Sequence, residues 1–225
     1  MTFSTSTLFI LIALASSSYA VADDWTCSNT EVSVKTTRQD LFAVICKTVE
    51  DTNAFLESIN LEVPSWVTIE TVDSVSNISD IHAVGQYDCR NKLIKILEYD
   101  AALKSFDDAE HAFGLNMSDE VWQSYISHEL AHAATDLQDK CNMRDFLASE
   151  YVSSITKISF FTETTRRRVL EKYDGLSGFT DKSDITEIYY SIAPSEFAVK
   201  SYLHFIATPD KKGFIQKLLE SSDSQ

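Results

Sequence analysis

The stretch Ser127-His128-Glu129-Leu130-Ala131-His132-Ala133 holds two histidines four residues apart in a segment with helical periodicity. Residues four apart lie one above the other on the same face of an α-helix, so both imidazoles can reach one metal ion. Val121 and Tyr125 precede the pair at steps of four and three, so His128 and His132 continue an apolar stripe. Because such a stripe faces the protein interior, we expect both histidines to point inward, near the floor of a cleft.

The glutamate between the histidines extends this interpretation from metal binding to chemistry. Glu129 directly follows the first histidine, as in zinc peptidases, where a glutamate in this position acts on a water molecule at the metal. We therefore predict zinc as the cofactor and Glu129 as the general base. Two alternatives stay open at this point: a pair of surface histidines on a helix, and a metal site with a structural role.

A zinc site of this kind needs a third protein ligand, which we expect from the next helix. A short turn over 139–142 separates the His pair from a second periodic segment that begins at Phe146. Helices joined by so short a turn pack antiparallel, which returns Glu150 to the His pair. A buried carboxylate is costly without a partner, and zinc would be such a partner. The alternative is an exposed Glu150, and Asp136 and Asp145 are weaker candidate ligands.

The spacing of these residues resembles a known pattern. His128-Glu129-Leu130-Ala131-His132, followed by Glu150 within Ala148-Ser149-Glu150-Tyr151-Val152, is similar to the gluzincin motif of zincin metallopeptidases. More closely, the chain resembles a group of small exported zincin-like proteins of unknown substrate, whose ligand helix begins His-Glu-Leu-x-His-Ala. The resemblance implies zinc on His128, His132 and Glu150, with Glu129 as the base.

The same group carries a Phe-Ala-Val-basic-x-Tyr-x-His-Phe segment near its C-terminus. Here that segment reads Phe197-Ala198-Val199-Lys200-Ser201-Tyr202-Leu203-His204-Phe205. In a zinc peptidase, a His or Tyr opposite the metal can stabilise the oxyanion that forms during hydrolysis, so Tyr202 and His204 are candidate catalytic residues. The alternative is that both side chains pack the C-terminal helix.

The N-terminus predicts export. Leu8-Phe9-Ile10-Leu11-Ile12-Ala13-Leu14-Ala15 is an apolar core, and Ala20-Val21-Ala22 forms a small-residue cleavage site, although Met1 to Thr7 contain no Lys or Arg. The apolar core is too short to span a membrane. We expect residues 1–22 to be a signal peptide cleaved after Ala22, which leaves a secreted or periplasmic protein.

Charge and composition limit the partners. The formal net charge is −15, and none of it lies in the leader, which argues against binding to nucleic acid or anionic membranes. Gly and Pro are scarce, and no repeat or linker interrupts residues 23–225, so we expect a single domain. We also expect this domain to be a monomer whose partner is a peptide or protein substrate.

Four cysteines follow the leader, at positions 27, 46, 89 and 141. An even count in an exported chain predicts two disulfides, and three pairings are possible. The sequence does not choose among them. Our working hypothesis is Cys27–Cys46, joining the first strand to the first helix, and Cys89–Cys141, joining the sheet to the turn after the ligand helix.

The predicted fold class is α+β and zincin-like: a small mixed sheet followed by a helical region that carries the HExxH helix. Alternation and apolar runs predict strands at 31–34, 66–72, 83–88 and 92–97. Helical periodicity predicts helices at 38–59, 101–106, from Ser118 to the turn at 139, 146–173, 183–190 and a C-terminal pair. We expect strand 92–97 to be the sheet edge that holds an extended peptide.

Two functions from different classes follow. The first is a secreted zinc peptidase that hydrolyses peptide bonds. The second is an exported binding protein that keeps the fold, with or without the metal, and turns over nothing. Asn77-Ile78-Ser79 and Asn116-Met117-Ser118 also match the glycosylation sequon, which matters only in a eukaryotic host.

Overall fold

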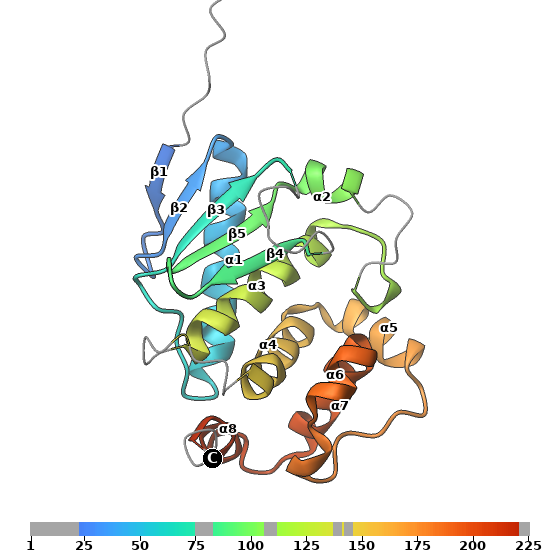
Figure 1. The fold of residues 1–225 in the computed structure, drawn as a ribbon. Coiled ribbons are helices and arrows are strands. Elements are labelled where there is room, and N and C mark those ends of the chain that lie inside the picture. Colours follow the sequence, from blue (N-terminus) through green and yellow to red (C-terminus); the bar gives the residue numbers. More distant parts are fainter. Residues whose placement is uncertain (1–22, 75–82, 106–111, 137–140, 142–145, 221–225) are drawn as a thin grey trace, which may run out of the picture.

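The computed structural model describes residues 23–74, 83–105, 112–136, 141 and 146–220 of the chain. The described residues form one mixed sheet and a larger helical region, so the fold class is α+β, as predicted. Figure 1 shows the sheet at one end of the molecule, α3 along the sheet, and α4 between α3 and α7. The predicted signal peptide lies outside the described residues.

Five strands make the sheet, in the order β1-β2-β3-β5-β4. Their bounds are Asp23–Thr26 for β1, Ser33–Thr36 for β2, Thr68–Val72 for β3, Gly85–Asp88 for β4 and Leu93–Leu97 for β5. β2, β3 and β5 run parallel, whereas β1 and β4 pair antiparallel at the two edges. The first strand was not predicted, and the strand predicted at 31–34 begins two residues later.

The expectation that strand 92–97 forms the sheet edge was wrong. β5 pairs with β3 on one side and with β4 on the other, so it is an internal strand. Ile94 and Ile96, which share one face of β5, are fully buried. The edge nearest the ligand helix is β4, whose residues are more polar.

The helices follow the predicted order. Their bounds are Gln39–Glu57 for α1, Tyr99–Ser105 for α2, Asp119–Thr135 for α3, Phe146–Phe160 for α4, Glu163–Lys172 for α5, Glu187–Ile192 for α6, Pro194–Ala207 for α7 and Lys211–Glu220 for α8, with 3-10 turns at Ala112–Gly114 and Lys182–Asp184. The long helix expected over 146–173 is two helices. Thr162 caps α5 by accepting the Thr165 backbone N–H, which starts a new helix there.

The ligand helix α3 is fixed at its start and along its length. Ser118 caps the helix by accepting the Val121 N–H. The negative charges of Asp119 and Glu120 in the first turn interact favourably with the positive end of the helix dipole. Trp122 is fully buried and donates its indole N–H to the Leu97 carbonyl oxygen at 2.7 Å. This contact anchors α3 to the last internal strand of the sheet.

Both hypothesised disulfides are present: Cys27–Cys46 and Cys89–Cys141. The first joins the end of β1 to α1. The second joins the turn between β4 and β5 to the segment between α3 and α4. Disulfides of this kind are typical of proteins that fold in an oxidising compartment. Within the described ranges, no helix has the length and apolar character needed to cross a membrane.

Candidate metal centre

The two histidines of α3 and the glutamate of α4 meet where these helices pack together. His128 Nε2 lies 3.1 Å from His132 Nε2. The Glu150 carboxylate oxygens lie 3.5 Å from His132 Nε2 and 3.9 Å from His128 Nε2. In a tetrahedral site with ligand bonds of about 2.0–2.2 Å, neighbouring ligand atoms lie about 3.3–3.6 Å apart. The three side chains are therefore spaced to hold one metal ion, as predicted.

Burial at this centre leaves polar atoms without partners. Glu150 is only 5 % exposed, and its Oε2 is buried and accepts no hydrogen bond from a described residue. His128 Nδ1 is also buried and makes no hydrogen bond of good geometry among the described residues, although the Ser153 backbone acts on this ring. Burial lowers the pKa of His128 well below its usual value, and the neighbouring charges of His132 and Lys157 lower it further, which keeps the imidazole neutral. A neutral imidazole and an unpaired carboxylate are the forms that bind a metal ion.

A chain of hydroxyl groups orients the second histidine. Thr135 donates its hydroxyl proton to the His132 carbonyl oxygen at 2.9 Å. The 2.7 Å bond between Thr135 and Ser149 must therefore use the Ser149 proton, which leaves Ser149 as an acceptor toward His132 Nδ1, also at 2.7 Å. His132 consequently carries its proton on Nδ1 and presents the Nε2 lone pair to the centre. Hydrogen bonds of this kind fix the ring orientation of metal-binding histidines.

We predict that Ser149→Ala weakens metal binding without unfolding the protein. Loss of a hydrogen bond behind a metal-binding histidine lowers affinity by about 10- to 100-fold. Ser153→Ala is the matched control, because Ser153 is buried on the same helix and its hydroxyl has no hydrogen-bond partner among the described residues. Competition against a chromophoric chelator measures both affinities. Equal zinc affinity in Ser149→Ala and wild type would show that the hydroxyl chain does not orient His132.

Glu129 lies on the side of α3 that faces the sheet edge. It is 7 % exposed, and its Oε2 accepts the Tyr87 backbone N–H of β4 at 2.8 Å. Its Oε1 accepts no hydrogen bond from a described residue. Burial raises the pKa of Glu129 and the charge of Glu150 adds to this, whereas His132 and the Tyr87 N–H oppose it. One carboxylate oxygen is therefore fixed by the strand, and the other is left for a proton-transfer partner.

Strand β4 comes unusually close to the ligand helix. A Cβ on Gly85 would lie 2.8 Å from Ile96 Cδ1 and 3.0 Å from Glu129 Cγ, so only glycine fits at this position without a shift. Two residues along the strand, the Tyr87 hydroxyl donates to Asp136 Oδ2 at 2.9 Å. Together with the Cys89–Cys141 disulfide, these contacts hold the strand against α3. Asp136 is thus a partner of β4 and lies outside the metal-binding group, and Asp145 lies outside the described residues.

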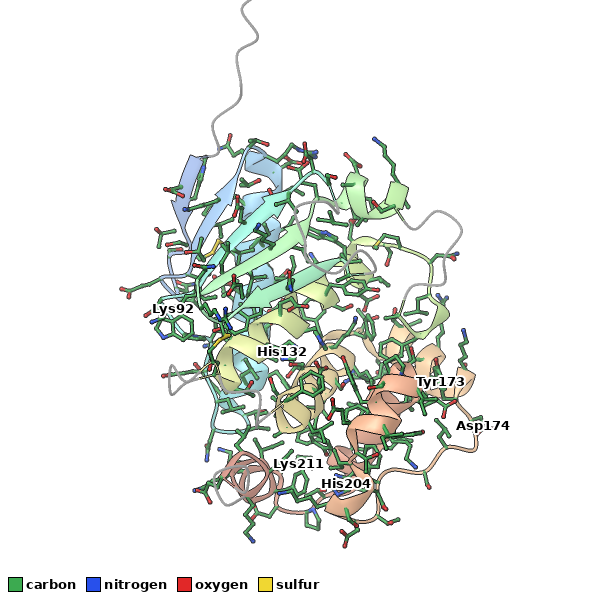
Figure 2. The ribbon with its side chains drawn as sticks, viewed as in Figure 1. Lys92, His132, Tyr173, Asp174, His204 and Lys211 are labelled. Atoms are coloured by element: carbon green, nitrogen blue, oxygen red, sulfur yellow. A yellow bond between two sulfur atoms is a disulfide. The ribbon has the colours of Figure 1, made fainter. Side chains whose placement is uncertain are left out.

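The structure does not bring Tyr202 and His204 to the metal centre. His204 Nδ1 lies 2.7 Å from the Tyr151 hydroxyl, and the His204 ring packs edge-on against Phe214 of α8. Tyr202 is buried, and its hydroxyl lies 3.5 Å from Arg166 Nη1. Figure 2 shows His204 well apart from His132, near α8. These contacts match the alternative in which both residues pack the C-terminal helices, so we give them no part in the chemistry below.

Three side chains at the centre were not predicted from the sequence. Ser149 and Thr135 orient His132, and Lys157 is a buried lysine of α4 close to the same group. A lysine between the buried residues Ile155 and Ile158 was the available signal for the last of them. The hydroxyl pair gave no signal, because Ser and Thr are common on all faces of helices.

The geometry defines a class: a protein with a partly buried His/His/Glu group, able to hold a metal ion, between two antiparallel helices beside a sheet edge. Residues 32–224 match the family DUF6639, described as a family of unknown function, and the chain belongs to it. No curated protein and no solved structure matches the chain with significance.

Proposed function

We propose that this protein is an exported, zinc-dependent peptidase with a zincin-like arrangement of sheet edge and ligand helix. One observation carries the proposal: His128, His132 and Glu150 are spaced to hold a metal ion, and the next residue after His128 is a buried carboxylate, Glu129, only one of whose oxygens accepts a hydrogen bond from a described residue. Two imidazoles and one carboxylate are a ligand set of catalytic zinc sites, which keep a fourth position open.

In the proposed reaction, the metal ion would activate the water and the peptide bond, and a side chain of the protein transfers the proton. Zinc held by the three ligands would acidify a water molecule and polarise the carbonyl group of a peptide bond. Glu129 takes the proton from the attacking water and passes it to the departing amine nitrogen. Its raised pKa suits a base that must later act as an acid. The Tyr87 N–H holds the carboxylate in place during both transfers.

Strand β4 offers a binding surface for the substrate. It is the edge strand of the sheet beside α3. Edge strands can bind an extended peptide through main-chain hydrogen bonds, and here the Tyr87 N–H already donates to Glu129, so the peptide would use other main-chain groups of the strand. Because Tyr87 on the same strand contacts Glu129, a peptide paired with β4 would pass close to the general base.

Export fits the rest of the molecule. The two disulfides, the predicted leader and the net charge of −15 suit a protein that acts outside the cytoplasm on peptides or proteins as a monomer. Nucleic acid and anionic membranes are poor partners for so acidic a chain.

The test combines metal content with cleavage. Purified protein should carry one zinc per chain, digest members of a broad peptide library, lose this activity with a chelator and regain it with added zinc. Stoichiometric zinc with no cleavage of any peptide would contradict the peptidase proposal and favour the exported binding protein.

A further inference from the structure

Lys157 is a buried cation at the interface between α3 and α4. It is only 7 % exposed, and burying an ammonium group is costly unless something compensates its charge. Burial lowers the pKa of Lys157 to about 7, while Glu129 and Glu150 act in the opposite direction. Burial of this charged group costs folding free energy, so we expect a function that requires the lysine in this place.

The position of Lys157 relates it to the metal centre. It follows Glu150 by seven residues, two helical turns, so both side chains lie on the face of α4 that contacts α3. Side chains on a helix lean toward its N-terminus, so the lysine extends back toward Glu150. Its Nζ lies 3.5 Å from the ring centre of Tyr125, which precedes His128 by one turn on α3. The ammonium group therefore rests on a ring whose Cα lies about 5 Å along the axis of α3 from that of His128.

A role as a simple counter-ion does not account for its contacts. A counter-ion of Glu129 or Glu150 would form an ion pair with one of them, yet none of the ion pairs or hydrogen bonds among the described residues involves Lys157 Nζ. The ammonium group instead rests on Tyr125 and lies 6.0 Å from the Phe113 ring. A cation over aromatic faces keeps its three N–H donors for another acceptor.

We propose that Lys157 is a catalytic residue that donates a hydrogen bond to the carbonyl oxygen of the peptide bond being cleaved. As the water oxygen bonds to the carbonyl carbon, the C=O π electrons move to the oxygen, and Lys157 stabilises the negative charge there without giving up its proton. The C–N bond then breaks, the carbonyl re-forms, and the amine takes its proton from Glu129. This inference rests on the proposed peptidase function and assigns the charge-stabilising part that Tyr202 and His204 are not placed to play.

Lys157→Met tests the assignment in the zinc-loaded protein. Methionine has a similar volume, and replacing a buried charge by an apolar side chain is commonly neutral or stabilising, so the variant should fold. We expect unchanged zinc content, a kcat lower by about 100-fold or more and a KM within about threefold of wild type, because removal of one oxyanion donor costs about 10²–10³ in kcat. Lys157→Arg should recover part of the loss. Lys212→Met, on the exposed face of α8, controls for the change in net charge.

Ligand binding gives a second readout that does not depend on turnover. A peptide phosphonate carries an anionic oxygen in place of the attacked carbonyl oxygen, whereas a peptide thiol binds the metal without one. Calorimetry should show weaker phosphonate binding to Lys157→Met and unchanged thiol binding. A wild-type kcat in Lys157→Met, or equal loss for both ligands, overturns the assignment of Lys157 alone. A wild-type protein that cleaves no peptide and binds neither ligand overturns the peptidase function, and the assignment with it.

Discussion

Replacing Glu150 with alanine is expected to remove most of the stability that zinc gives the wild-type protein. At a zinc concentration about 1,000 times Kd, binding stabilises a folded protein by about 4 kcal/mol. Loss of one of three protein ligands should lower affinity by at least about 100-fold, more than the loss of a supporting hydrogen bond. At the same zinc concentration the stabilisation then falls to about 1.4 kcal/mol. Urea unfolding with and without zinc measures the difference.

The metal-free proteins should behave differently. Glu150 Oε2 is buried and accepts no hydrogen bond within the described part of the chain, so its removal relieves a cost and the apo variant should lose little stability. Glu62→Ala removes an exposed carboxylate elsewhere and is the matched control, with a zinc response equal to wild type. If zinc stabilises Glu150→Ala as strongly as wild type, Glu150 is not a ligand.

Replacing Glu129 with glutamine is expected to abolish peptide cleavage while zinc stays bound. General-base catalysis contributes about 10²–10⁴-fold, so kcat should fall by that factor. The glutamine carbonyl oxygen can still accept the Tyr87 N–H, so the strand and the helix should keep their positions. A peptide selected from the library digest serves as the substrate, and zinc affinity is measured in parallel.

Glu120→Gln is the control for this experiment. Glu120 lies on the same helix and accepts the Thr162 backbone N–H on one carboxylate oxygen and the Thr165 hydroxyl on the other. The glutamine oxygen can still accept the Thr162 N–H, and the glutamine NH2 can donate to the Thr165 hydroxyl oxygen. Its activity should equal that of wild type. Full activity in Glu129→Gln would instead remove Glu129 from the mechanism.

The metal-binding group could be predicted from the sequence because two short-range rules determine it. A spacing of four residues places His128 and His132 on one helix face, and a short connection makes the next helix return beside the first. The antiparallel packing follows from the contacts: Thr135 meets Ser149 near the connection, and Tyr125 meets Lys157 far from it.

The order of strands could not be read in the same way. The strands predicted at 83–88 and 92–97 follow each other closely in the chain, but the sequence does not state which of the two pairs with β3. The parallel pairing of Ile69 with Ile94 decides it, and this contact joins residues far apart in the chain. The polar residues of β4 were the available signal for an edge, since edge strands are less apolar than internal ones.

The C-terminal motif shows the limit of assigning chemistry to a short pattern. Tyr202 and His204 belong to a segment that resembles a family motif, yet their contacts are with Arg166, Tyr151 and Phe214. Packing partners of this kind depend on the arrangement of α4, α7 and α8, which no local pattern specifies. Lys157 illustrates the converse, because its place beside the centre follows from the packing of α3 against α4.

A crystal structure of the zinc-soaked protein, with diffraction data collected above and below the zinc absorption edge, shows directly whether His128, His132 and Glu150 hold the metal. We expect one anomalous peak within about 2.0–2.2 Å of His128 Nε2, His132 Nε2 and a Glu150 carboxylate oxygen. A zinc peak elsewhere on the protein, or a Glu150 side chain turned to solvent beside an occupied His pair, would contradict it.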